Sequence, residues 1–115
     1  MKYDADAILL RIFIGESDEH DGEHLYMHIL KMLKEEGIAG ATVLRGIAGF
    51  GKTSRIHTSS ILRLSTDLPL VMEVTDLAEN IERIKPRLMK LVQGGLITEE
   101  RVRIIKYEGD DAPRT

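Results

Sequence analysis

The chain has 115 residues, enough for one ordinary hydrophobic core, so we expect a single domain over residues 1–115. Its 16 basic and 19 acidic residues give a net charge of −3, so the overall electrostatic field gives no reason to expect nucleic acid or an anionic membrane as a partner. The sequence has no cysteine, which excludes disulfides, thiolate catalysis and zinc–thiolate sites.

Two features of the sequence bear on where the protein is located in the cell. The start of the sequence lacks the basic region and the cleavage site of a secretory signal, and no apolar run approaches the roughly 20 residues that cross a bilayer. We therefore expect a cytoplasmic protein that does not insert into membranes.

The polar residues 108–115, EGDDAPRT, are predicted to fray.

The first half of the chain predicts a strand, a helix and a second strand. Residues 7–14, AILLRIFI, are rich in strand formers and are closed by Gly15. After an acidic turn, apolar residues recur at helical spacing up to a helix stop at Gly37. These apolar residues are Leu25, Ile29, Met32 and Leu33. The β-branched Thr42 and Val43 then predict a second strand, which leads into a glycine-rich loop.

The third strand and the second helix follow that loop. Residues 70–74 alternate with the period of a strand, which is expected to end near Thr75. Asp76 and Glu79 have the spacing of a capping box, so the helix is expected to begin at once. Pro86 lies inside the helical pattern and removes one backbone donor, so we expect a kink or a break there.

The end of the second helix and the last strand complete the predicted order. Gly94 and Gly95 are expected to end the helix, and the paired Glu99 and Glu100 are assigned to a solvated turn. Residues 101–107, RVRIIKY, predict the last strand. The order strand, helix, strand, strand, helix, strand predicts an α+β, ferredoxin-like fold with an antiparallel four-stranded sheet and both helices on one face.

The first strand is apolar on both of its faces. One face carries Ile8, Leu10, Ile12 and Ile14, and the other carries Leu9 and Phe13. Two helices cover only one face of a ferredoxin-like sheet, so the second apolar set predicts a contact between subunits.

The stretch RGIAGFGKTS, residues 45–54, matches the phosphate-loop pattern of nucleotide hydrolases. A phosphate loop opens a helix whose amino terminus holds the phosphates. The residues that follow here, SRIHTSSILRLST, have no helical spacing of apolar residues and lead into a strand. We therefore reject an ATPase. No nucleophile–base pair stands out elsewhere, so we expect no enzymatic activity.

The same stretch, together with residues 55–58 that follow it, keeps the chemistry of an anion site. Its glycines let the backbone approach a ligand closely, its lysine and arginine add positive charge, and its histidine and threonine are suitable donors to phosphate oxygens. The candidate binding residues are Gly46, Gly49, Gly51, Lys52, Arg55, His57 and Thr58. From composition alone, a solvated hairpin loop without a ligand is the alternative.

Three histidines, His20, His24 and His28, recur every four residues. The last two are placed on one stripe of the first helix, with carboxylates nearby that could complete a metal site. A metal-binding trimer that uses these histidines and resembles the divalent-ion tolerance proteins is therefore the alternative function. The spacing lacks the HExxH pattern, and no metal ligand is assigned.

The order of elements, the GFGK of residues 49–52 and the HT of residues 57–58 resemble the PII-like signalling proteins. The segments GATVLRG, GFGKTSRIHTSSILRLSTDLP and GGLITEERVRIIKY are similar, more specifically, to the PII-like family known as domain of unknown function 190. The resemblance extends from the first strand to Tyr107.

This resemblance implies a homotrimer with an adenine nucleotide, such as AMP, ADP, ATP or cyclic AMP, in the cleft between subunits. It also implies a loop that reports the bound state to a target protein, for instance a membrane transporter or an enzyme. Gly49, Gly51 and Lys52 would face the phosphates, and Gly94 and Gly95 would stand at a second phosphate loop. The regulatory loop is shorter than in PII proteins and lacks the tyrosine that some of them modify, so uridylylation is not expected.

Overall fold

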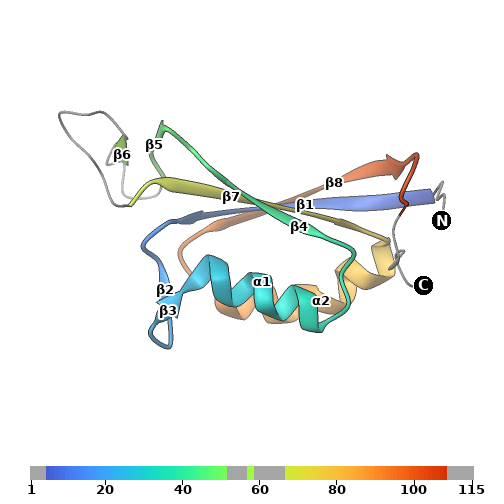
Figure 1. The fold of residues 1–115 in the computed structure, drawn as a ribbon, viewed down its shortest axis with the longest axis horizontal. Helices are drawn as coiled ribbons and strands as arrows, with labels where there is room; N and C mark the ends of the chain where they lie inside the picture. Colours follow the sequence, from blue (N-terminus) through green and yellow to red (C-terminus); the bar gives the residue numbers. More distant parts are fainter. Residues whose placement is uncertain (1–4, 52–56, 59–66, 109–115) are drawn as a thin grey trace.

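The computed structural model describes residues 5–51, 57–58 and 67–108, with residues 57–58 described by their backbone alone. The elements in chain order are β1 (Ala5–Gly15), β2 (Glu19–His20), β3 (Glu23–His24), α1 (Leu25–Glu35), β4 (Ala41–Arg45), β5 (Ala48–Gly49), β6 (His57–Thr58), β7 (Pro69–Asp76), α2 (Ala78–Leu91) and β8 (Leu96–Ile104). Both helices lie against one face of a single sheet (Figure 1). Lys52 and Arg55 fall outside the described residues.

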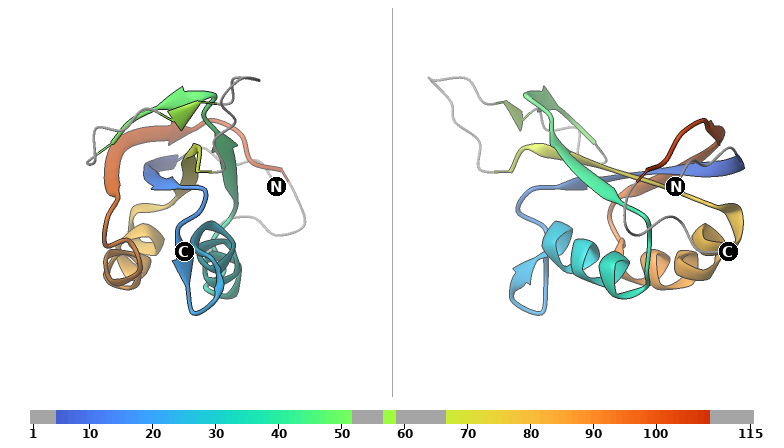
Figure 2. Two further views of the ribbon diagram at one scale, coloured as in Figure 1. Left: turned by 90° about the vertical axis from the view of Figure 1, so that its left-hand side faces the viewer. Right: turned by 45° about the vertical axis from the view of Figure 1, so that its right-hand side comes forward.

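The main sheet has four strands in the order β4-β7-β1-β8, and every neighbouring pair is antiparallel. Two further views show the sheet as one layer and the two helices as the other (Figure 2). This arrangement confirms the predicted ferredoxin-like fold. No helix within the described ranges is long and apolar enough to cross a membrane.

The hydrophobic core fills the space between the sheet and the helices. Alternate residues of β1 and β7 point into it, and both helices contribute their apolar stripes, as the sequence periodicity predicts. The buried cluster consists of Leu10, Ile12, Ile14, Leu25, Ile29, Met32, Leu33, Leu70, Met72, Val74, Ile81, Ile84, Leu88 and Val92.

The second helix is not split at Pro86. α2 runs from Ala78 to Leu91 as one element, with Pro86 inside it. Ile84 and Leu88 lie on either side of the proline and are buried against the sheet, so packing holds both halves in place despite the missing backbone donor. The predicted break is therefore wrong, and the alternative of a kink at Pro86 stays a prediction.

The start of α2 also differs from the predicted capping box. Asp76 is the last residue of β7, and Leu77 occupies the N-cap position without a side-chain cap. The buried Asp76 carboxylate instead accepts hydrogen bonds from the Leu77 backbone N–H at 2.6 Å, the Ala39 N–H at 2.9 Å and the Asn80 Nδ2 at 2.9 Å. It joins β7 to α2 and to the turn before β4.

The last strand begins earlier than predicted. β8 starts at Leu96, so Glu99 and Glu100 lie in a strand and not in a turn. Glu99 contacts Lys85 of α2, and Glu100 contacts Arg11 of β1 on the other face. On a strand beside β1, each carboxylate finds a cation on its own face, which offsets the low strand propensity of glutamate.

Candidate functional site

The chain between β4 and β7 forms a hairpin at its base. Gly46 follows β4, and its backbone N–H donates to the Pro69 carbonyl oxygen at 2.7 Å. β5 then pairs antiparallel with β6, with Gly49 opposite His57. The backbone at residues 57–58 is thus extended and paired, which agrees with the rejection of a phosphate-loop helix.

The three glycines of this hairpin do not have the same structural role. A Cβ on Gly46 would lie 2.9 Å from Pro69 Cγ, and a Cβ on Gly49 would lie 3.1 Å from the same atom. Both glycines are therefore explained by close packing against Pro69. A Cβ on Gly51 would meet no described heavy atom within 4 Å. The described fold gives no reason for glycine at position 51.

The same division holds for the glycine pair before β8. A Cβ on Gly95 would lie 2.4 Å from the Phe13 carbonyl oxygen and 2.8 Å from Val92 Cγ1, so only glycine fits there. A Cβ on Gly94 would meet no described heavy atom within 4 Å. Gly94, like Gly51, is free of a packing requirement within the part of the chain that the structure describes.

The two glycine sets lie at the same end of the sheet but on opposite edges. Arg45 pairs with Leu70, Leu70 with Ile14, and the neighbouring Phe13 with Leu96. Gly46 follows β4 at one edge and Gly95 precedes β8 at the other, so three strand spacings, or about 14 Å, separate them. Within one copy, the structure does not bring these predicted site residues together.

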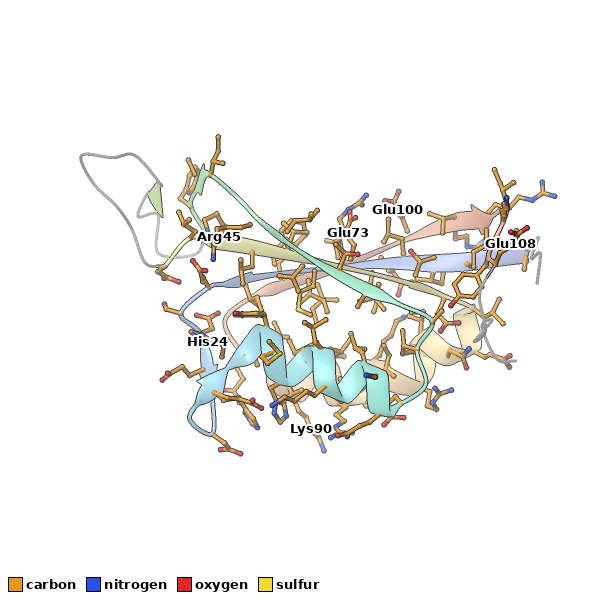
Figure 3. The ribbon with its side chains drawn as sticks, in the orientation of Figure 1. His24, Arg45, Glu73, Lys90, Glu100 and Glu108 are labelled. Carbon is orange, nitrogen blue, oxygen red and sulfur yellow. The ribbon has the colours of Figure 1, made fainter. Side chains whose placement is uncertain are left out.

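Several exposed side chains at this end were missed from the sequence. Arg45 precedes Gly46 and forms an ion pair with Glu16 of the β1–β2 connection. Phe50 and Ile47 are 70% and 79% exposed. The only signal for these side chains in the sequence is that a cation and two large apolar residues lie among glycines. Figure 3 shows Arg45 at the end of the sheet opposite Glu108.

The histidines are arranged differently from the predicted helical stripe. His24 ends β3 and is not part of α1, and its Nδ1 lies 3.1 Å from the Glu16 carbonyl oxygen. The rings of His20 and His28 are neighbours instead, with centroids 4.3 Å apart. Among the described residues, no three or more histidine, aspartate or glutamate side chains form a group that could hold a metal ion.

Glu23 connects this cluster to the surface of α1. One carboxylate oxygen lies 2.9 Å from His28 Nδ1, and the other accepts from Lys31 Nζ at 2.8 Å. The hydrogen bond from Lys31, and secondly the one from His28, hold the pKa of Glu23 below its usual value. Glu23 is therefore ionised and orients the His28 ring.

The sheet face opposite the helices carries an apolar row. The strand register places one residue from each strand side by side: Leu44, Val71, Phe13 and Leu96. Leu44 and Leu96 at its ends are 49% and 57% exposed. The next row contains Arg11, whose Nε lies 3.0 Å from Glu73 Oε2. The predicted second apolar face is therefore present and uncovered in one copy.

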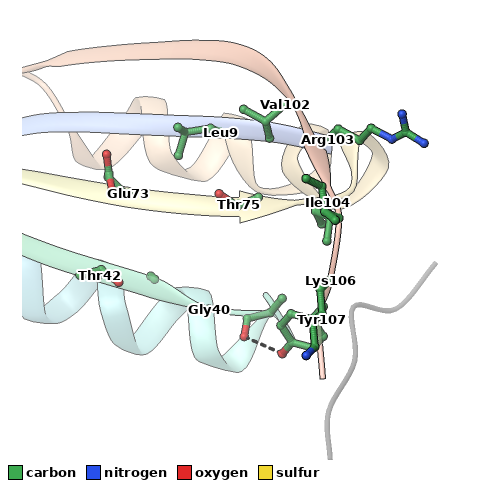
Figure 4. Close-up of a pocket in the computed structure, with 13 residues that line it drawn as sticks. Leu9, Gly40, Thr42, Glu73, Thr75, Val102, Arg103, Ile104, Lys106 and Tyr107 are labelled. Carbon is green, nitrogen blue, oxygen red and sulfur yellow. Dashed lines mark hydrogen bonds between the residues drawn. The ribbon is translucent and has the colours of Figure 1, made fainter. Parts of the chain in front are cut away.

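An open hollow of about 810 Å³ lies at the other end of the same face. Leu9, Glu73 and Thr75 form its floor, and residues 102–107 run along its side (Figure 4). The Tyr107 hydroxyl donates to the Ala39 carbonyl oxygen at 3.2 Å and fixes this segment beside the start of β4.

Residues 7–104 match the family model of DUF190, described as an uncharacterised ACR. The chain is 42% identical to a UPF0166 protein of Methanocaldococcus jannaschii over 103 residues, which cover 89% of this chain and 94% of that protein. It is also 42% identical to a UPF0166 protein of Aquifex aeolicus over 97 residues, with 84% and 91% coverage.

Two solved structures with the same fold are PII-like proteins. One, from Thermus thermophilus and described as a PII-like signalling protein, has a TM-score of 0.64 at 18% identity and covers 89% of this chain and 92% of its own. CPII from Thiomonas intermedia, bound to ADP, AMP and bicarbonate, has a TM-score of 0.61 at 12% identity, with 90% and 92% coverage. The chain therefore belongs to the DUF190 family, and its fold is the ferredoxin-like fold of the PII-like proteins.

Proposed function

We propose that the protein is a PII-like, non-enzymatic regulator that binds an adenine nucleotide between two copies of the chain and reports the bound state to a target protein. The observation that carries the proposal is a pair of glycines at one end of the sheet, Gly51 and Gly94, for which the described residues show no packing requirement. CPII, a protein of the same fold, is bound to ADP and AMP.

The β4–β7 hairpin supplies the anion-binding chemistry. At Gly51 the described residues leave room beside the backbone for a phosphate oxygen, and successive backbone amides can hold an anion without a helix terminus. Lys52 follows Gly51 directly and would add the positive charge. We keep Arg55, His57 and Thr58 as proposed ligands on the basis of their donors.

The antiparallel sheet explains how both glycine sets can serve one ligand. β4 and β8 are the edge strands, and they run in opposite directions because strand direction alternates across the sheet. If β4 of a second copy lies beside β8, its carboxyl end meets the amino end of β8. The second copy's residues 46–51 then lie next to Gly94, and one ligand can contact both.

A homotrimer satisfies this arrangement with three equivalent seams, each of them a contact between β4 of one copy and β8 of the next. Each copy offers β4 to one neighbour and β8 to the other, which is a heterologous contact that closes into a ring. The apolar row of Leu44, Val71, Phe13 and Leu96 gives such copies a surface to bury. Sedimentation should therefore give three times the 12.9 kDa of one chain. A monomer would contradict the seam.

Nucleotide binding is tested by thermal shift with AMP, ADP, ATP and cyclic AMP. A ligand at about a hundred times its dissociation constant adds roughly 2.7 kcal/mol, which raises the melting temperature by several degrees at this size. Lys52→Ala should reduce the shift. If no nucleotide moves the melting temperature and Lys52→Ala changes nothing, nucleotide binding is excluded.

Glycine substitutions make the test specific to the seam. Gly51→Ala and Gly94→Ala should leave the melting temperature of the free protein unchanged, because neither Cβ meets a described atom within 4 Å. Both should weaken the nucleotide response, because a methyl group obstructs the approach of phosphate. Gly40→Ala is the matched control, since Gly40 is equally free of neighbours but lies before β4 at the far end of the sheet.

A further inference from the structure

Phe50 has an unusual environment for an aromatic residue. Among the described phenylalanines and tyrosines it alone has a largely exposed side chain, at 70%, whereas Phe13 is half-buried in the sheet. A phenylalanine in water forgoes the free energy of burial, so the described fold does not account for it. An exposed ring of this kind commonly marks a contact made on binding.

The backbone on the amino-terminal side of Phe50 is fixed. Gly49 pairs with His57 and packs against Pro69, and the Gly46 N–H is hydrogen-bonded to the Pro69 carbonyl oxygen at 2.7 Å. These contacts hold the position from which the Phe50 side chain extends. A ring presented from a fixed backbone loses little freedom when a ligand binds, which favours recognition.

The residue after Phe50 is Gly51, at which an added Cβ would meet no described heavy atom within 4 Å. Consecutive Cα atoms are about 3.8 Å apart, so an apolar ring stands next to a glycine at which the described residues leave room for a ligand. A ligand with both a phosphate and a planar base matches this pair of groups, whereas phosphate alone uses only the amide. We propose that the Phe50 ring stacks on the base of the nucleotide and gives the site its preference for purines. This inference rests on the proposed nucleotide function.

Stacking requires an aromatic ring, whereas simple apolar contact does not. The larger π-surface of a purine stacks better than that of a pyrimidine, and an aliphatic side chain cannot replace the ring. Ile105 lies at the other end of the sheet and is 80% exposed, so it serves as an apolar control without a ring. If Phe50 only filled a contact between subunits, leucine would replace it with small effect on the choice of base.

Isothermal titration of the full chain with ADP, UDP and pyrophosphate tests the proposal. Phe50→Leu should weaken ADP binding roughly tenfold, since stacking on an aromatic side chain has that order of effect. The same substitution should reduce the ratio of the affinity for ADP to the affinity for UDP, and it should leave the affinity for pyrophosphate unchanged. Phe50→Tyr should keep the ADP affinity, and Ile105→Ala should leave the affinity for all three ligands unchanged.

The contrary outcomes separate this inference from the function on which it rests. Wild-type protein that binds neither ADP nor pyrophosphate would overturn both. Wild-type binding of ADP together with an unchanged ADP-to-UDP ratio in Phe50→Leu would overturn the stacking role alone. An equal loss of ADP and pyrophosphate in Phe50→Leu, or a change in its sedimenting mass, would assign Phe50 to the subunit contact.

Discussion

Replacing Asp76 with alanine tests how the second helix is attached to the sheet. Asp76 is completely buried, and its carboxylate accepts from one donor in the turn before β4 and from two donors at the start of α2. These donors are Ala39 N–H, Leu77 N–H and Asn80 Nδ2, at 2.9, 2.6 and 2.9 Å. The substitution removes all of these hydrogen bonds at once and leaves the donors in place.

The magnitude follows from the surroundings of the donors. A buried donor without a partner costs about 1–3 kcal/mol. Leu77 and Asn80 are buried, whereas Ala39 is half-buried and can find water, so the three costs do not add fully. We expect Asp76→Ala to lower the free energy of unfolding by about 3–5 kcal/mol. Asp76→Asn keeps the shape but turns an amide donor toward another donor, and should cost about 1–3 kcal/mol.

Urea unfolding at one fixed protein concentration measures the effect, because the proposed trimer would make the stability depend on concentration. Asp6→Ala is the matched control, since Asp6 is an exposed carboxylate on β1 and should change the stability by less than about 0.5 kcal/mol. If Asp76→Ala costs no more than Asp6→Ala, the carboxylate does not hold β7, α2 and the turn together.

Two further substitutions test the packing and the electrostatics. Gly95→Ala should cost about 1–3 kcal/mol in thermal unfolding, because its Cβ would lie 2.4 Å from a β1 carbonyl oxygen, and Gly94→Ala should cost nothing measurable. Since Lys31 and His28 lower the pKa of Glu23, its pairing stabilises the folded protein above the ordinary value of 4.5 and is lost as the pH falls through the lowered folded-state value. The stability difference between wild type and Glu23→Gln should therefore shrink below about pH 4.5; a difference independent of pH would contradict this pairing.

The fold was predictable because its signals are local and periodic. Met72 and Val74 alternate as in a strand, and Ile81, Ile84 and Leu88 recur as on a helix face, so the order of elements follows from short windows of sequence. The errors arose where a distant contact decides the outcome. Packing of α2 against the sheet overrides Pro86, and pairing with β1 extends β8 across two glutamates that would otherwise favour a turn.

The candidate site was predictable in composition but not in its division of roles. When only the neighbouring residues in the sequence are considered, all five candidate glycines are equally suited to close approach by a ligand. Pro69 and Phe13 distinguish them, since the first explains Gly46 and Gly49 and the second explains Gly95. Both contacts span many residues of sequence, and no local pattern encodes them. Nor does the sequence reveal that the two glycine sets lie on opposite edges of the sheet.

The placement of Gly51 and Gly94 near opposite edges has a genetic consequence. If the proposed ring of three copies forms, two inactive alleles, one damaged at each position, would assemble into mixed rings when expressed in the same cell. In a ring of three that contains both kinds of copy, one junction combines both lesions and another combines neither, so that each hybrid particle regains an intact pocket. Function that is partly restored when both mutants are expressed together, and that neither mutant has alone, would thus indicate a site shared between neighbouring copies.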